Sequence, residues 1–181
     1  ASIAQSPAAE PMRPVDAPVL YEARSGAGIV RTTRDYPRRS GAPLQFDIYQ
    51  PKATDARKSG PLVVFANDRR LGLKDWGGYQ SWGRLLASFG ANAVVYQSAD
   101  NGAADLEDLM RHLDEKAVEF GIDYSGAAIF AMSGNAPVGV EYLSAPHGAA
   151  TKCAVIYYGW IPDAAQTRAD LSLLIVRAGQ D

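Results

Sequence analysis

The chain has 181 residues, of which 47% are hydrophobic and 21% charged, and its formal net charge is −2 at pH 7. This length supports one hydrophobic core, and the composition is that of an ordinary globular domain, which excludes a fibrous or disordered chain. Because the two signs of charge nearly cancel, no overall field would recruit nucleic acid or an anionic membrane, and we expect neither partner.

The first 18 residues contain Pro7, Pro11, Pro14 and Pro18, and we predict an irregular tether there. Residues 19–181 are predicted to form a single domain. The sequence starts at Ala1 without the basic and apolar regions of a signal peptide, which fits either the mature start of an exported protein or an arbitrary boundary. Of the two we favour export. No apolar window is long enough to predict a transmembrane helix.

Two strands, at 28–36 and 44–49, are predicted next, because both alternate apolar with polar residues as a half-exposed antiparallel pair does. Residues 40–43 supply the turn between them. The segment 51–60 is polar and basic and is predicted to be a loop.

From Pro61 onward the pattern changes to continuous apolar runs, which are typical of strands buried on both faces of a parallel sheet. Helical periodicity separates these runs, and it predicts that Trp76, Tyr79 and Trp82 belong to the core rather than to a substrate site. The predicted strands are 62–66, 93–96, 127–132, 152–158 and 171–178, and the predicted helices are 76–89, 103–120, 136–144 and a short helix or turn at 163–169. The alternation predicts an α/β three-layer sandwich, a mostly parallel sheet entered by an antiparallel hairpin.

Cys153 is the only cysteine, which excludes a disulfide or a cysteine-based metal site within the chain. It lies in an apolar run, so we predict a buried side chain that only fills space. No cluster of His, Asp and Glu has the spacing of metal ligands. Gly77-Gly78 lacks the lysine of a phosphate-binding loop. The sequence therefore predicts no metal and no cofactor.

Ser133 lies at the end of a predicted strand and before a predicted helix, with Ala131 and Asn135 two residues away on either side. This small-x-Ser-x-small pattern is a loosened form of the G-x-S-x-G nucleophile elbow. In that motif the serine occupies a strained turn, and its neighbours are small because strand and helix backbones nearly touch. Asn135 is the poorest fit. The alternative is that Ser133 is an ordinary helix N-cap.

Three polar positions follow the ends of predicted parallel strands: Ser133, Asp181 and the segment 67–72. The carboxyl ends of parallel strands meet at one edge of a sheet, so we expect these positions to share that edge. A serine followed by an aspartate is the chain order of the hydrolase triad. Alternatively, Asp181 is an acid of a terminal loop and 67–70 is a solvated turn.

Four segments together resemble the α/β-hydrolase family, and within it the dienelactone-hydrolase-like and small acyl-esterase branch. These segments are 63–68, 79–88, 130–136 and 173–181, and the resemblance spans roughly residues 28–181. The family resemblance implies a serine hydrolase of small-molecule carboxylic esters. A non-catalytic binding domain of the same fold and a serine peptidase remain as alternatives, although no feature selects amides over esters.

The resemblance also implies a role for each site residue. Ser133 would attack the ester carbonyl to form an acyl-enzyme, and Asp181 would orient the histidine that takes its proton. The N–H of Gly134 and one from the Asp68–Arg69 turn would hold the oxyanion. Arg69 or Arg70 could instead bind a carboxylate of the substrate.

The chain contains two histidines, and neither is predicted to reach Ser133. His112 is predicted on the solvent face of the helix at 103–120. His147 is predicted in a loop at the opposite edge of the sheet. Since the sequence stops at Asp181, we expect the domain to be incomplete at its C-terminus. The missing histidine, Asn135 and the unusual Asp-Arg-Arg loop favour the binding-domain alternative.

Overall fold

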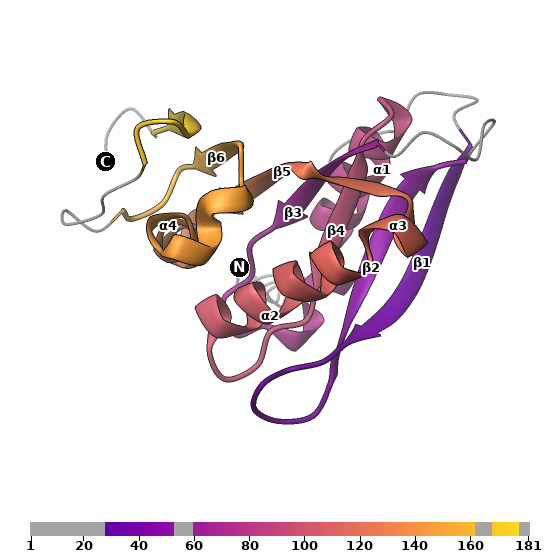
Figure 1. Cartoon of the computed structure of the whole chain (residues 1–181), viewed down its shortest axis with the longest axis horizontal. Helices are drawn as coiled ribbons and strands as arrows, with labels where there is room; N and C mark the ends of the chain where they lie inside the picture. The colour runs from indigo at the N-terminus through magenta and orange to yellow at the C-terminus, as the bar shows by residue number, and fades with distance from the viewer. Residues whose placement is uncertain (1–27, 53–59, 162–167, 178–181) are drawn as a thin grey trace, which may run out of the picture.

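A computed structural model describes residues 28–52, 60–161 and 168–177. Its centre is a 7-stranded sheet with the order β1-β2-β4-β3-β5-β6-β7, drawn in Figure 1. The first two strands pair antiparallel, β2 pairs antiparallel with β4, and every other pair is parallel. The strands are β1 (Ile29–Tyr36), β2 (Leu44–Pro51), β3 (Gly60–Phe65), β4 (Asn92–Tyr96), β5 (Ile122–Met132), β6 (Cys153–Tyr157) and β7 (Ser172–Val176). The predicted mostly parallel sheet with an antiparallel entry is confirmed.

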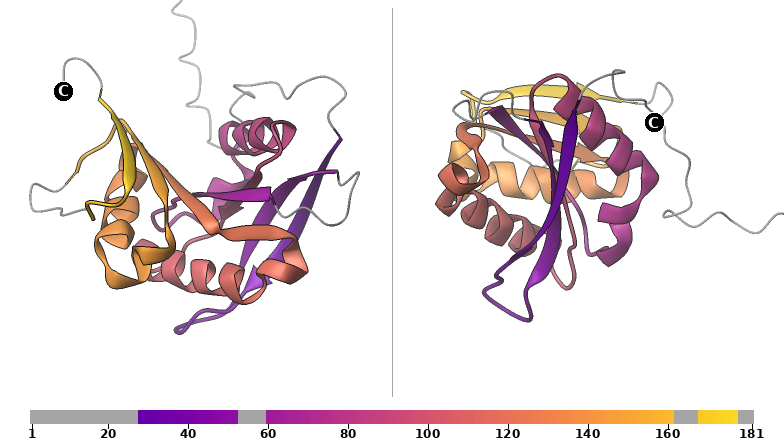
Figure 2. Two further views of the ribbon diagram at one scale, coloured as in Figure 1. Left: turned by 45° about the horizontal axis from the view of Figure 1, so that its top comes forward. Right: turned by 90° about the vertical axis from the view of Figure 1, so that its right-hand side faces the viewer.

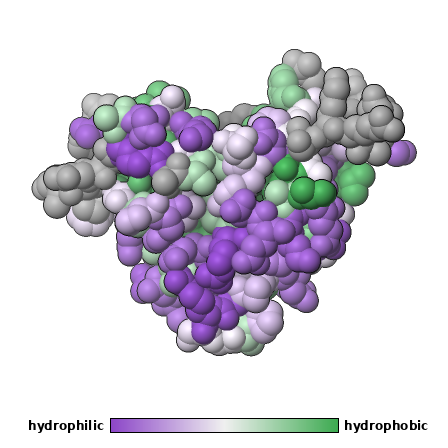
Figure 3. Space-filling model, in the orientation of Figure 1, coloured by the Kyte–Doolittle hydropathy of each residue, from purple (hydrophilic) through white to green (hydrophobic). Residues whose placement is uncertain are grey.

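Helices cover both faces of this sheet, with α1 on one side and α2 and α4 on the other (Figure 2). The α-helices are α1 (Gly77–Ser88), α2 (Gly102–Glu115), α3 (Ala117–Phe120) and α4 (Ala136–Ser144), and short 3-10 helices occupy η2 (Leu71–Asp75), η3 (Ser133–Asn135) and η4 (Pro146–Ala150). The visible face over α2 is hydrophilic (Figure 3), whereas its inward residues Leu106, Leu109 and Leu113 are fully buried. None of the helices in the described part of the chain is both long and apolar enough to cross a membrane.

Each face of the sheet has its own hydrophobic core. The larger core lies under α2, α3 and α4 and includes Phe46 and Ile129, and the smaller lies under α1 and includes Phe65 and Tyr79. The rings of Trp76 and Trp82 pack against the smaller core, with ring centroids 5.2 Å from Tyr79 and 4.8 Å from Phe130, respectively. The prediction that the aromatic residues of this helix belong to the core is confirmed.

The last two strands are less buried than predicted. Cys153 is exposed, and Leu174 keeps 57% of its surface accessible. The reason is that α1 packs mainly against β2 and β4. It meets β6 at Tyr157, whose ring centroid lies 6.4 Å from that of Trp82, and leaves Cys153 exposed. The predictions of a buried Cys153 and of two fully buried strands are therefore wrong.

Two element boundaries also differ from the prediction. The single helix predicted at 103–120 is two helices, because the backbone at Lys116 (φ −108, ψ 10) leaves the helical conformation between α2 and α3. The strand β5 begins at Ile122 rather than at 127. The predicted tether at 1–18 lies outside the described residues, as does most of the element predicted at 163–169.

Candidate active site

Ser133 lies directly after β5, the strand at the middle of the parallel part of the sheet, and its side chain is exposed. Its φ is +55, which side-chain-bearing residues rarely adopt. The N-cap position of η3 is Met132 and that of α4 is Asn135, so Ser133 is not an N-cap. A strained serine with an accessible hydroxyl, between a strand and a helix, is the geometry of a nucleophile elbow.

Close backbone packing holds this elbow (residues 131–135) in place. A Cβ added to Gly139 of α4 would lie 2.6 Å from the Cβ of Ala131, so strand and helix touch there, as the small residue at 131 predicts. A Cβ on Gly159 would overlap the carbonyl oxygen of Ser133 and lie 2.6 Å from the Cβ of Ala136. Sequence reasoning missed Gly139 and Gly159, because the surfaces they meet belong to a different element of the chain.

Asn135 is buried, with 5% of its surface exposed, and its side chain connects the elbow to two other elements. Its Oδ1 accepts a hydrogen bond from the backbone N–H of Asp68 at 2.9 Å, and its Nδ2 donates to the hydroxyl of Tyr79 at 2.9 Å. Burial raises the pKa of Tyr79 to about 12, although the bond from Asn135 acts in the opposite direction. An amide is accommodated at this position because the fold supplies partners for both of its ends.

The β3 loop (residues 67–70) lies beside the elbow, and its first three backbone N–H groups all donate to side chains. Asn67 donates to the hydroxyl of Tyr96 at 3.1 Å, and Arg69 donates to Oγ of Ser98 at 3.1 Å. Asp68 donates to Asn135, as described above. An oxyanion could use the N–H of Asp68 or Arg69 only by displacing Asn135 or Ser98, respectively. The oxyanion role of these two residues stays a prediction, and it requires that displacement.

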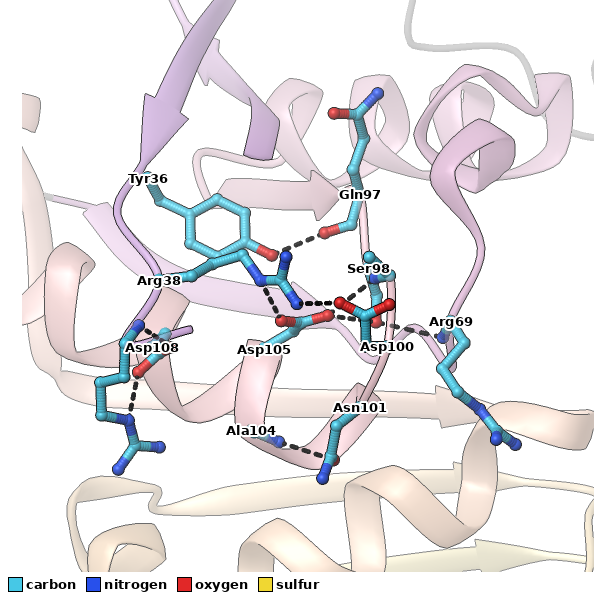
Figure 4. Close-up of polar contacts among 12 residues, drawn as sticks. Tyr36, Arg38, Arg69, Gln97, Ser98, Asp100, Asn101, Ala104, Asp105 and Asp108 are labelled. Atoms are coloured by element: carbon cyan, nitrogen blue, oxygen red, sulfur yellow. Dashed lines mark hydrogen bonds and ion pairs between the residues drawn. The ribbon is translucent and has the colours of Figure 1, made fainter. Parts of the chain in front are cut away.

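The acceptor Ser98 is itself fixed by a buried carboxylate, as Figure 4 shows. Asp105, 1% exposed, accepts from Oγ of Ser98 at 2.9 Å and from the N–H of Ala99 at 2.7 Å. It also accepts from Nε of Arg38 at 2.7 Å, and Arg38 belongs to the turn between β1 and β2. The network holds Arg69, whose φ is +52, from three separate segments of the chain.

The two arginines of the β3 loop lie in different surroundings. The guanidinium of Arg69 is paired with the adjacent Asp68, with Nε 2.9 Å from Oδ1. Arg70 has no ion-pair partner among the described residues, and its Nη2 lies 3.8 Å from the position that a Cβ on Gly134 would occupy. Arg70 is therefore the arginine that reaches the elbow.

Two backbone hydrogen bonds connect the end of β7 to the elbow. The N–H of Tyr158 donates to the carbonyl of Val176 at 2.7 Å, and the N–H of Ser133 donates to the carbonyl of Tyr158 at 2.6 Å. The carboxyl ends of β5, β6 and β7 thus meet beside Ser133. Asp181, the predicted triad acid, lies outside the described residues.

Neither histidine belongs to this edge of the sheet. His147 lies in η4, before the amino end of β6, where the N–H of Lys152 bonds to the carbonyl of Ala127. From Ala127 to Ser133 the extended chain covers about 20 Å. His112 packs against the rings of Phe46 and Phe120, with centroids 6.0 and 5.8 Å away, respectively.

The burial of His112 lowers its pKa. The ring of His112 is half-buried against the core, so the prediction that His112 lies on the solvent face of the helix is wrong. The ring is half-buried because α3, which follows α2, places Phe120 against it.

A cavity of about 180 Å³ lies between α2, α4 and η4, and Glu107, Glu141 and His147 line it. It is a feature of the helical layer and does not include Ser133. Within the described ranges no group of three or more His, Cys, Asp or Glu side chains is arranged to hold a metal ion.

The same arrangement of strands and helices occurs in solved structures of other proteins. Brefeldin A esterase, a bacterial homologue of human hormone-sensitive lipase, superposes with a TM-score of 0.64 at 16% identity, over 80% of this chain and 44% of that chain. The chain has the α/β-hydrolase fold. Vibralactone cyclase gives a TM-score of 0.62 at 16% identity, over 80% of this chain and 47% of that one. A bacterial heroin esterase gives 0.58 at 12% identity, over 75% and 46%, respectively.

These likenesses show the fold alone, because the identities are only 12% to 16%. The chain spans about half the length of these structures: 44% to 47% of each is covered. No protein-family model and no curated protein sequence matches the chain.

Proposed function

We propose that the full-length protein is a serine hydrolase of small-molecule carboxylic esters, which acts through an acyl-enzyme on Ser133. The observation that carries this proposal is the conformation of Ser133: a φ of +55 and an exposed hydroxyl, at the end of β5 and the start of a helix. Strain of this kind persists where the surrounding structure enforces it, and it gathers at catalytic sites. Two neighbours in fold, brefeldin A esterase and heroin esterase, are esterases by name.

In the proposed reaction, Oγ of Ser133 bonds to the ester carbonyl carbon while its proton passes to a histidine. The N–H of Gly134 holds the oxyanion; it belongs to the first turn of η3, where backbone N–H groups have no partner within the helix. One such donor lowers the barrier by ~3 kcal/mol. The alcohol leaves with the proton from the histidine, and water then releases the acid.

Asp181 is the proposed triad acid, since β7 ends beside the elbow and Asp181 follows β7 by a few residues. It would hold the imidazole in the correct tautomer and stabilise the imidazolium that forms. His112 and His147 are the only histidines of these 181 residues, and both lie away from Ser133. The proposal therefore requires a histidine from outside these residues.

Ester hydrolysis by the full-length gene product tests the proposal. With p-nitrophenyl acetate as substrate, Ser133→Ala should lower kcat/KM by at least about a thousandfold, because it removes the nucleophile. The matched control is Ser144→Ala at the exposed end of α4, which should hydrolyse the ester at the unaltered rate. Equal rates for the unaltered protein and Ser133→Ala would exclude the proposed function.

The second candidate function is a non-catalytic binding domain with the α/β-hydrolase fold. The observation in its favour is that Asn135 and Ser98 already accept from the N–H groups of Asp68 and Arg69, which an oxyanion would otherwise use. This candidate predicts that the folded full-length protein hydrolyses p-nitrophenyl acetate no faster than its Ser133→Ala variant does.

A further inference from the structure

An oxyanion at the elbow needs more than the single donor at Gly134. Oxyanion holes combine two or more donors, from the backbone or from side chains, aimed at the place where negative charge develops. In this chain the N–H groups of Asn67, Asp68 and Arg69 already bond to the side chains of Tyr96, Asn135 and Ser98. If the site is catalytic, a donor other than these three N–H groups is therefore needed beside Gly134.

The guanidinium of Arg70 is the charged donor nearest to the elbow on this loop. Its Nη2 lies 3.8 Å from the Cβ position of Gly134, and glycine places no side chain in between. Its charge also acts on Tyr79, where it opposes the rise in pKa that burial causes. Arg69, the preceding residue, is tied to Asp68 by two contacts, at 2.9 and 3.2 Å.

We propose that the guanidinium of Arg70 is the second oxyanion donor, beside the N–H of Gly134. This inference rests on the proposed function. As the bond from Oγ of Ser133 to the carbonyl carbon forms, the carbonyl π pair moves onto oxygen and the Oγ proton moves to the histidine. Arg70 donates a hydrogen bond to that oxygen without transferring its proton. When the carbonyl re-forms, the alcohol leaves with the proton from the imidazolium.

This role predicts a particular kinetic signature. An interaction made only with the developing oxyanion lowers the barrier to the chemical step and leaves ground-state binding alone. Loss of the guanidinium should therefore lower kcat on every ester, whatever its charge. A guanidinium that binds a substrate carboxylate would behave differently, since its loss would raise KM for anionic esters only.

The test compares Arg70→Met and Arg70→Lys in the full-length protein, with p-nitrophenyl acetate as the neutral ester and p-nitrophenyl hemisuccinate as the anionic one. For Arg70→Met we expect kcat to fall about 100- to 1000-fold on both esters, with KM changed less than about twofold. Arg70→Lys should recover part of kcat, because the ammonium keeps the charge but loses the fork of donors. The control Arg84→Met removes an exposed arginine of α1 and should match the unaltered protein.

Each other outcome overturns the inference in a recognisable way. A rise in KM for the hemisuccinate alone would make Arg70 a carboxylate-binding residue, and unchanged kinetics on both esters would leave it without a role. In both cases Ser133→Ala would still abolish hydrolysis, so the proposed function would stand. If the unaltered protein and Ser133→Ala are equally slow, the proposed function fails and this inference fails with it. Thermal unfolding of each variant shows whether Arg70→Met remains folded.

Discussion

The elbow and the β3 loop are neighbouring turns, and each contains a non-glycine residue with a positive φ. They differ in whether their polar groups are already hydrogen-bonded. Ser133 and Arg69 both have a positive φ, +55 and +52, without being glycine. At the elbow the hydroxyl of Ser133 is exposed, and no bond to it is present among the described residues. In the β3 loop three consecutive N–H groups bond to side chains, and the carboxylate of Asp68 pairs with Arg69.

The elbow keeps the Ser133 hydroxyl free to react, whereas the β3 loop uses its N–H groups to hold its own conformation. A strained conformation costs of order 1–3 kcal/mol, so it persists only where other contacts impose it. Around Ser133 those contacts are steric, from Gly139 and Gly159, and they leave its hydroxyl free. Around Arg69 they are hydrogen bonds, which use up the groups that could otherwise bind a ligand. Substitutions that remove the hydrogen bonds of the β3 loop or disturb the steric contacts of the elbow test this difference.

The largest effect is expected from Asp105→Ala, which removes the carboxylate beneath the β3 loop. Arg38, whose side chain is 7% exposed, would keep only the exposed Asp100, and Ser98 would lose its acceptor. Leaving a buried charge without its partner costs about 3–5 kcal/mol of unfolding free energy, measurable by urea denaturation. Asp114→Ala, on the exposed side of α2, is the control and should change stability by less than about 0.5 kcal/mol. A loss below about 1 kcal/mol for Asp105→Ala would mean that the network does not hold the loop.

Gly159→Ala should have the next largest effect, and it acts on the elbow. Its methyl group would meet the carbonyl of Ser133 and lie 2.6 Å from the Cβ of Ala136. Overpacking against backbone costs about 3 kcal/mol, and the forced shift should also slow the reaction of Ser133. Gly126→Ala is the matched control, since its nearest neighbour would be Oδ2 of Asp123 at 3.6 Å. If both alanines are tolerated equally in thermal unfolding, the elbow is not sterically enforced.

Asn135→Ala should cost about 2 kcal/mol, because it leaves the N–H of Asp68 and the hydroxyl of Tyr79 without a partner. Tyr79→Phe removes only one of these two hydrogen bonds, the one between Asn135 and the hydroxyl of Tyr79. A double-mutant cycle between the two substitutions measures their coupling, which we expect at about 0.5–1 kcal/mol. Additive losses would show that Asn135 does not join the elbow to α1.

His112 should give the smallest effect, on stability alone. Burial lowers its pKa in the folded protein, so between the folded and unfolded pKa values the unfolded chain binds more protons. Stability is then complete above the unfolded pKa of about 6.5 and declines as the pH falls through the folded pKa. His112→Gln should flatten this decline in urea midpoints measured between pH 7 and pH 5. A change in the pH profile of ester hydrolysis would contradict its placement away from Ser133.

The sequence predicts most of the sheet, because the signals for it are local. The apolar run at 62–66 and the one at 93–96 predict buried strands, and β3 and β4 lie there. The burial of Cys153 cannot be predicted from local sequence, because it depends on which part of β6 a helix covers. The helix α1 contacts β6 at Tyr157 and leaves Cys153 exposed. The same limit explains the break at Lys116, since no glycine or proline marks it.

For the candidate site, the sequence identifies Ser133 and its small neighbour Ala131 but not the state of the β3 loop. The acceptors for the loop come from Tyr96, Ser98 and Asn135, which are 29 to 67 residues away along the chain. Spacing within a motif carries no information about such bonds. The same holds for Asn135, the poorest fit to the motif: only the structure shows that its amide bonds to Asp68 and Tyr79.

Covalent labelling of the full-length protein with a fluorophosphonate tests the central claim most directly, because the reagent modifies serines that act as nucleophiles. We predict one labelled site, Ser133, identified by mass spectrometry of the digested protein, and no labelling of the folded Ser133→Ala variant. A folded full-length protein that stays unlabelled, or one labelled equally after Ser133→Ala, would contradict the assignment of Ser133 as the nucleophile.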